Sequence, residues 1–250
     1  MDPVIITRTA ETQWEAVSDG RTVGHGDISH RPDGRLFVSV DVWQDPVFDR
    51  LATAVLADLP ATPVHTLVAA DDPGLKARWE RLGFTVGRRE REYTLPTAPG
   101  ALAPPPEVVV LPGTEADPGR LRALDRAIRE EVEASVGWRT MPAEVVAGPT
   151  GSLPLDPAKY AVATRGGRYA GLVRVAAVRR RARIGLIAVR AEDRRHGIGR
   201  ALLAHALGSL HHRGITSAWA EVDETNTAAL ALFEGAGAER TGGCIELVRH

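Results

Sequence analysis

The order of apolar and polar positions along the chain occurs twice. Residues 14–43 predict three strands around an Asp-Gly turn ("WEAVSDGRTVGHGDI", then "RLFVSVDVW"), and residues 160–191 repeat this order around a Gly-Gly turn. After each third strand come a helical pattern, another β-rich run ("VHTLVAA", "SAWAEV") and a short helix that closes on Gly83 or Gly237. A repeat of this order predicts duplicated domains, and we expect an α/β fold in both halves.

A change from strand pattern to helix pattern follows the third strand of the second copy. "RIGLIAVRA" is a continuous apolar run of strand length, typical of a strand buried on both faces. Apolar positions at helical spacing follow from residue 199 and stop at Gly214, a C-cap signal. Gly197 and Gly199 are therefore predicted to lie on a strand-to-helix turn, at the helix N-terminus.

A proline-rich segment, "PTAPGALAPPP" at residues 96–106, separates the two copies. Proline lacks the amide donor and fixes its own φ, so this segment breaks both helix and strand and reads as a semi-rigid, extended linker. We predict one domain at residues 1–95 and a second at residues 107–250.

Composition narrows the class of protein. The chain has 250 residues, of which 44 % are apolar and 25 % charged, with a net charge of −1. This charge gives no reason to expect nucleic acid or an acidic membrane as a partner. Cys244 is the single cysteine, which excludes an intrachain disulfide and a cysteine-based zinc cluster. No signal-like or membrane-spanning apolar run is present. We expect a cytoplasmic protein without a metal, monomeric or homodimeric.

Positive charge gathers at the predicted turn, in "RRHGIGR". The first amides of a helix have no intrahelical partner, glycine lets a ligand approach the backbone, and Arg194, Arg195 and Arg200 add full charges. A diphosphate fits such a site best. The competing interpretation is a simple turn with solvated arginines. A P-loop and a dinucleotide fingerprint are both excluded, because Gly199 is followed by Arg-Ala and Leu202 replaces the third glycine.

Together with this turn, the stretch "AEVDETNTAALALFEGAGA" resembles the GNAT family of N-acetyltransferases. Arg194-x-x-Gly197-x-Gly199 is similar to the family's acyl-CoA pyrophosphate loop, and Asn226, Ala229 and Gly237 match its second signature. The resemblance covers about residues 107–250. It implies two GNAT-like domains with mixed sheets, and acetyl-CoA held where the fourth and fifth strands splay. The implied acetyl-CoA-binding residues are Ile187, Ala188, Val189, Arg194, Arg195, His196, Gly197, Ile198, Gly199, Arg200, Asn226 and Phe233.

Transfer of an acetyl group to an amine requires a base for the amine proton. The strand "SAWAEVD" alternates, so Trp219, Glu221 and Asp223 share one face. Glu221 stands where ribosomal-protein acetyltransferases of the family have their base, with Asp223 as second choice. The alternative for Glu221 is a solvated or ion-paired surface carboxylate.

The family's proton-donating tyrosine is Phe233 here, and a phenyl ring cannot donate a proton. Water, or a substitute donor among Tyr160, Tyr169 and Cys244, could protonate the leaving thiolate. A third possibility is that the domain is an acyl-CoA-binding sensor that does not turn over.

The N-terminal copy departs further from the family. "WERLGF" at residues 79–84 resembles the second signature, but the preceding helix has no glycine loop and brings Asp45 and Asp49 to the place of the phosphates. Aspartates there repel a diphosphate. We expect a degenerate copy that binds no acetyl-CoA; such tandem arrangements occur in the family.

The acceptor is expected along "LRALDRAIREEVEASVGWRTMPAEVV", since the first helices of a GNAT domain line that site. The candidate acceptor-binding residues are Glu130, in the acidic run of this stretch, and Trp138, as an apolar wall. The competing interpretation of the acidic run is a solvated helix face. We therefore predict an acetyl-CoA-dependent N-acetyltransferase acting on a primary amine of a small molecule or peptide, with an aminoglycoside-type substrate as one alternative.

Overall fold

The computed structural model describes residues 3–31, 33–98, 104–135, 137, 155–178 and 181–250, and divides the chain into two compact units. Unit 1 contains Met1–Arg89 and Gly243–His250, and unit 2 contains Glu90–Gly242. Both units combine strands with helices, so the expected mixed α/β fold is confirmed. Among the described residues, no helix has both the length and the apolar character needed to cross a membrane.

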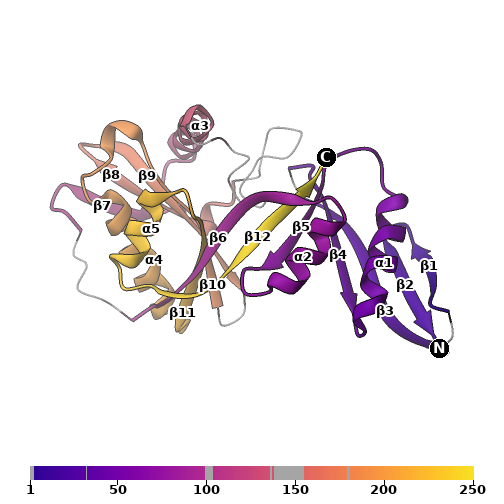
Figure 1. Cartoon of the computed structure of the whole chain (residues 1–250). Helices are drawn as coiled ribbons and strands as arrows, with labels where there is room; N and C mark the ends of the chain where they lie inside the picture. Colours follow the sequence, from indigo (N-terminus) through magenta and orange to yellow (C-terminus); the bar gives the residue numbers. More distant parts are fainter. Residues whose placement is uncertain (1–2, 32, 99–103, 136, 138–154, 179–180) are drawn as a thin grey trace. The chain divides into compact units, whose positions relative to one another are not determined.

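Unit 1 is a mixed sheet with two helices (Figure 1). Its strands lie in the order β1-β2-β3-β4-β5-β12; β4 and β5 are parallel and the other pairs are antiparallel. Helix α1 packs against β2, β3 and β4. The elements are β1 Ile5–Ala10, β2 Gln13–Ser18, β3 Arg21–His30, β4 Leu36–Val42, α1 Asp45–Ala57, β5 Val64–Ala69, α2 Pro73–Arg81 and the C-terminal part of β12 Glu239–Arg249.

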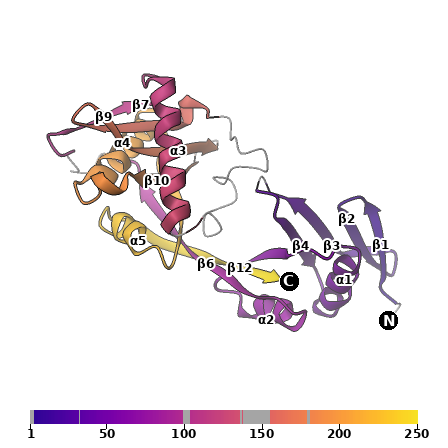
Figure 2. The ribbon, with the colours of Figure 1, turned by 90° about the horizontal axis from the view of Figure 1, so that it is seen from above.

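Unit 2 carries the second copy of the pattern. Its strands lie in the order β6-β11-β10-β9-β8-β7, in which β10 and β11 are parallel. Helix α4 packs on one face of this sheet and α3 on the other (Figure 2). Alternate residues of β8 point to opposite faces, so one set joins the core beneath α4 and the other the core beneath α3. The elements are β6 Thr85–Pro96, β7 Val108–Pro112, α3 Pro118–Ser135, η3 Pro157–Lys159, β8 Tyr160–Arg165, β9 Arg168–Val178, β10 Arg181–Val189, η4 Ala191–Asp193, α4 Ile198–His212, β11 Ser217–Asp223 and α5 Thr227–Glu234.

The internal repeat is visible in matching helix caps. Asp72 is the N-cap of α2 and accepts from the amide of Leu75 at 2.8 Å, while Asn226 is the N-cap of α5 and accepts from the amide of Ala229 at 3.0 Å. The two helices are followed by glycines in the left-handed region, Gly83 and Gly237. The two copies therefore share local geometry as well as order.

Two strands are divided between the units. Residues 90–96 of β6, which precede the proline-rich segment, pair antiparallel with β11 inside unit 2. Residues 244–249 of β12, the end of the chain, pair antiparallel with β5 inside unit 1. Each half of the sequence thus completes the sheet of the other half. The domain boundaries expected at residues 95 and 107 differ from this division. Strand pairing places residues 90–96 in unit 2 and residues 243–250 in unit 1, whereas the linker alone would place them the other way round.

A fragment of residues 107–250 is expected to be insoluble, whereas a fragment of residues 90–242 is expected to fold. The first lacks the strand that pairs with β11 and keeps a terminal strand without its partner β5, so it exposes edges that template aggregation. Soluble yield and circular dichroism of the two fragments measure this. A folded, monomeric 107–250 fragment would contradict the assignment of β6 to unit 2.

The C-terminal strand is held in unit 1 by a buried carboxylate. Glu246 is 5 % exposed and accepts from Arg35 Nη1 at 2.8 Å; its Oε1 also lies 2.8 Å from His65 Nδ1, and its Oε2 lies 3.4 Å from Arg88 Nη2. Burial by itself raises the pKa of Glu246, but the His65 hydrogen bond and the two arginine charges outweigh it, and the pKa is lowered.

Glu246→Gln is expected to lower the free energy of unfolding at neutral pH by about 3–5 kcal/mol, the usual cost of breaking a buried pair. Because the folded pKa is lowered, the carboxylate stabilises unit 1 above its ordinary value of 4.5, and this stabilisation is lost as the pH falls through the folded pKa. The variant should therefore lose part of the acid dependence seen in urea unfolding. Exposed Glu239 on the same strand is the control, and an equal effect of Glu239→Gln would refute the assignment.

Candidate active site

The predicted strand-to-helix turn is present at the end of β10. The chain passes from Val189 through η4 into α4, which begins at Ile198. Gly197 is the helix N-cap with φ 75°, and Arg195 also adopts a left-handed conformation, with φ 67°. Arg194, Arg195, His196 and Arg200 are exposed around it. The turn presents the first amides of α4 and several cationic side chains to the same region.

Buried and half-buried ion pairs hold this turn in place. Asp193 is 2 % exposed and accepts from Arg165 Nη1 at 3.3 Å. Glu131, near the end of α3, accepts from Arg190 Nε at 2.6 Å and from the amide of Ala191 at 2.7 Å. Glu131, one glutamate of the acidic run of α3, therefore has a structural role, because it holds the turn. Glu130, its neighbour and the expected acceptor residue, is exposed on the same helix.

The two glycines of the turn differ in what their surroundings require. A Cβ on Gly197 would lie 2.8 Å from Pro105 Cγ, so the backbone conformation and the close neighbour both demand glycine. A Cβ on Gly199 would make only ordinary contacts, the nearest being Leu232 Cδ2 at 3.6 Å. Protein contacts alone do not explain Gly199, which leaves room for a ligand to approach the backbone there.

β10 and β11 separate beside the turn. Their parallel pairing covers residues 181–183 and 217–219 and, in the described part of the chain, extends no further. β10 continues to Val189 paired with β9 on its other side, and β11 continues to Asp223 paired with β6. Residues 187–189 of β10 therefore present one backbone edge to the opening. An extended ligand can hydrogen-bond such an edge as an added strand does.

The side chains of β11 alternate as the sequence predicted. Ala218, Ala220 and Val222 are buried beneath α4 and α5, while Glu221 and Asp223 lie half-buried on the opposite face. Glu221 accepts a hydrogen bond from Arg183 Nη2 of β10, and the Arg183 guanidinium lies over the Trp219 ring, 5.1 Å from its centroid. Glu221 is thus paired, the alternative left open by the sequence. Asp223 accepts from the amide of Thr225 at 2.8 Å, in the turn before α5.

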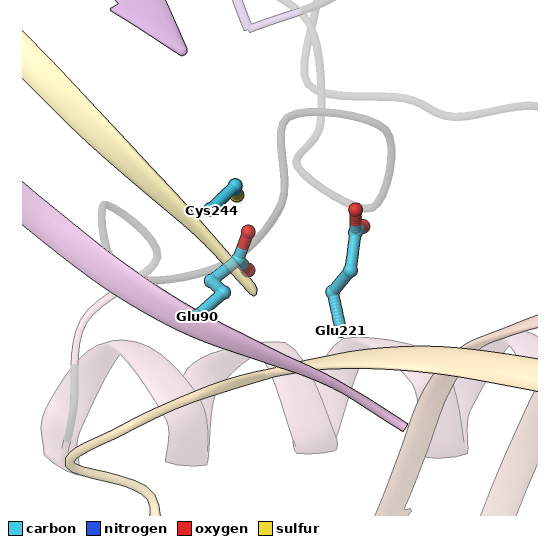
Figure 3. Close-up of side chains that lie close together, drawn as sticks. All are labelled: Glu90, Glu221 and Cys244. Carbon is cyan, nitrogen blue, oxygen red and sulfur yellow. The ribbon is translucent and has the colours of Figure 1, made fainter. Parts of the chain in front are cut away.

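Two further carboxylates share this face and were missed in the sequence. Glu92 of β6 is the direct cross-strand partner of Glu221, and Glu90 is the partner of Asp223. Glu92 accepts from the Thr241 hydroxyl at 3.0 Å. Figure 3 shows Glu90 and Glu221 on their neighbouring strands. The alternating run "REREYTL" was the available signal, but nothing in it indicates that its partner is β11.

Phe233 lies in the hydrophobic core. It is 5 % exposed and stacks on Tyr93 of β6, with ring centroids 6.1 Å apart. The Tyr93 hydroxyl donates to Glu234 at 2.6 Å, and burial, followed by the bond to Glu234, raises its pKa. Tyr93 of β6 therefore packs a hydroxyl-bearing ring against Phe233, which stands at the position of the family's tyrosine.

The other expected residues have the following places. The side-chain Oδ1 of Asn226 accepts the N-cap hydrogen bond of α5, which leaves the side-chain Nδ2 to donate to a ligand. Tyr160 is buried against α3, and the Tyr169 hydroxyl accepts from the amide of Asp117 at 2.9 Å, so both have structural surroundings. Trp138 lies outside the described residues.

The corresponding helix of unit 1 has a different N-terminus. The N-cap of α1 is Gln44, and Asp45 and Asp49 occupy its first turns. Asp45 pairs with Arg78 at 2.7 Å and Asp49 with Arg81 at 3.6 Å. The start of α1 therefore carries carboxylates paired with the neighbouring helix, where α4 begins with a glycine and exposed arginines.

Comparison with known proteins agrees with this geometry. Residues 128–238 match the model of the Acetyltransferase (GNAT) family. A "[Ribosomal protein bS18]-alanine N-acetyltransferase" of Escherichia coli (strain K12) is 39 % identical over 74 residues, which is 30 % of this chain and 50 % of that protein. The chain thus spans about half the length of the curated relatives it matches.

Two solved structures resemble nearly the whole chain. A GCN5-related N-acetyltransferase from Sphaerobacter thermophilus has a TM-score of 0.68 at 21 % identity, over 97 % of this chain and 82 % of that one. A tandem GNAT protein from the clavulanic acid biosynthesis pathway has a TM-score of 0.62 at 18 % identity, over 94 % and 81 %. At these identities the likeness establishes the fold.

Proposed function

We propose, because residues 128–238 match the model of the GNAT acetyltransferase family, that the chain transfers an acetyl group from acetyl-CoA to a primary amine. The observation that carries the proposal is the turn at the start of α4, with its left-handed Gly197 and exposed arginines, beside the separation of β10 and β11. An anion site and an open strand edge stand next to each other there.

The residues of the turn and of β10 fit acetyl-CoA. The amides of residues 195–200 and the charges of Arg194, Arg195 and Arg200 would bind the pyrophosphate. The edge of residues 187–189 would bind the pantetheine by main-chain hydrogen bonds, and the Asn226 amide nitrogen could donate to it. Bound there, acetyl-CoA supplies the activated acetyl thioester.

Glu221 is the proposed base. As a carboxylate it accepts the proton of the acceptor ammonium, and the free amine then attacks the thioester carbonyl. Arg183, resting on Trp219, fixes the carboxylate through one oxygen. Asp223 remains the second choice. Phe233 cannot protonate the leaving thiolate, so water, or a hydroxyl such as that of Tyr93, would do so.

The acceptor is proposed to be a peptide or small-molecule amine. The ribosomal-protein alanine N-acetyltransferase that resembles this chain suggests a peptide with a free N-terminal alanine. An aminoglycoside or a polyamine is the small-molecule counterpart. Phe233 favours a second candidate function, a sensor that binds acyl-CoA without turnover.

The decisive experiment combines binding with turnover for the full chain. Calorimetry should give one acetyl-CoA site per chain, since unit 1 has aspartates where unit 2 has its glycine turn. Release of free CoA is then followed with an alanine-initiated peptide, spermidine and an aminoglycoside, and products are identified by mass. Binding of acetyl-CoA without CoA release for any amine would favour the sensor, and absence of binding would refute both functions.

A further inference from the structure

Glu90 is a buried carboxylate beside the proposed base. It is 5 % exposed, and a carboxylate oxygen of Glu90 and one of Glu221 lie within 4.8 Å of each other. The two side chains come from the neighbouring strands β6 and β11 (Figure 3). They lie on the face of these strands opposite α4 and α5. Glu90 precedes the proline-rich segment, so a residue of the N-terminal half of the sequence lies next to Glu221.

The same face already binds one organic cation. Arg183 donates to Glu221 and lies over the Trp219 ring, so its guanidinium is held between a carboxylate and an aromatic face. An alkylammonium ion is recognised by the same two kinds of group. Two carboxylates this close together create a negative potential that attracts a cation. Glu90 therefore adds acceptor oxygens and negative charge where Glu221 meets the acceptor.

We propose that Glu90 is a specificity-determining residue that binds, together with Glu221, the ammonium group of the acceptor. This inference rests on the proposed function. The preferred substrates are aliphatic primary amines, which arrive as cations, and not aromatic amines, which are neutral at pH 7. The strand that unit 2 takes from the N-terminal half of the sequence thus supplies part of the acceptor site.

The test compares Glu90→Gln with Glu92→Gln in the full chain. Both remove one carboxylate from β6 on the same face, but Glu92 is bonded to Thr241. Spermidine and an alanine-initiated peptide are first compared with the wild-type protein, and the amine that is acetylated faster becomes the probe. Glu90→Gln should raise the KM for that amine about 10- to 100-fold, the loss of one charge-assisted hydrogen bond. The KM for acetyl-CoA should stay unchanged, and Glu90→Asp should recover most of the loss.

The outcomes separate the two proposals. A wild type that binds acetyl-CoA but acetylates neither probe bears against the proposed function. An active wild type with equal KM values for Glu90→Gln and Glu92→Gln overturns the role of Glu90 alone. A thermal melt of each variant detects misfolding. A Glu90→Asp variant that melts like wild type but shows the full KM increase also overturns the proposed role of Glu90.

Discussion

Glu221→Gln is expected to lower turnover by about 10²–10⁴, the usual contribution of a positioned base. The amide keeps the shape of the side chain and can still contact Arg183, but it cannot accept the amine proton. Affinity for acetyl-CoA should be unchanged, because Glu221 lies on β11 and the proposed anion site lies at the start of α4. Steady-state kinetics and calorimetry measure the two effects separately.

The pH dependence gives this prediction its control. At high pH more of the acceptor is already a free amine, so the deficit of Glu221→Gln should shrink as the pH rises. Asp223→Asn is the matched variant on the same strand and face, and it should have the smaller effect. Unchanged turnover of Glu221→Gln at neutral pH would move the base elsewhere, with Asp223 the next to test.

Gly199→Asp is expected to abolish acetyl-CoA binding. Its side chain would place bulk and negative charge at the first turn of α4, where we propose that the pyrophosphate binds. Each charge-assisted contact to a phosphate is worth about 1.5–3 kcal/mol, so repulsion together with lost contacts should remove measurable affinity. Calorimetry measures this directly, and normal affinity of the variant would defeat the assignment of the turn.

Alanine at the two glycines separates ligand effects from folding effects. Gly197→Ala should destabilise the protein, because φ 75° costs a side chain about 1–2 kcal/mol and its Cβ meets Pro105. Gly199→Ala should leave the melting temperature unchanged or raised, since its Cβ makes ordinary contacts. A loss of acetyl-CoA affinity in Gly199→Ala at unchanged stability would therefore show that the added methyl group obstructs the ligand. Lowered stability of that variant would show that Gly199 is structural.

Local features of the fold and site could be predicted from the sequence. The glycine turn between β10 and α4 depends on residues adjacent in the chain, and the alternation of β11 depends on a two-residue period. Both are confirmed. The caps Asp72 and Asn226 likewise follow from the local choice of residue.

Long-range pairing could not be predicted in the same way. Glu90 and Glu92 reach Glu221 because β6 pairs with a strand more than 100 residues later, and no periodicity in a single sequence encodes the partner of a strand. The acidic run of α3 shows the same limit. Glu131 looked equivalent to Glu130, yet its contacts with Arg190 and Ala191 come from another element.

The pairing of β12 with β5 also bears on how the chain matures during its synthesis. β5 ends at Ala69, and its partner residues 244–249 are synthesised much later, so that edge stays uncovered until those residues have left the ribosome. At ordinary elongation rates the edge stays bare for on the order of 10 s. An uncovered strand edge on a nascent chain is a binding site for other strands, and pairing across so long a separation is slow. Holdase chaperones should therefore be recruited to the exposed edge of β5 until β12 has been synthesised.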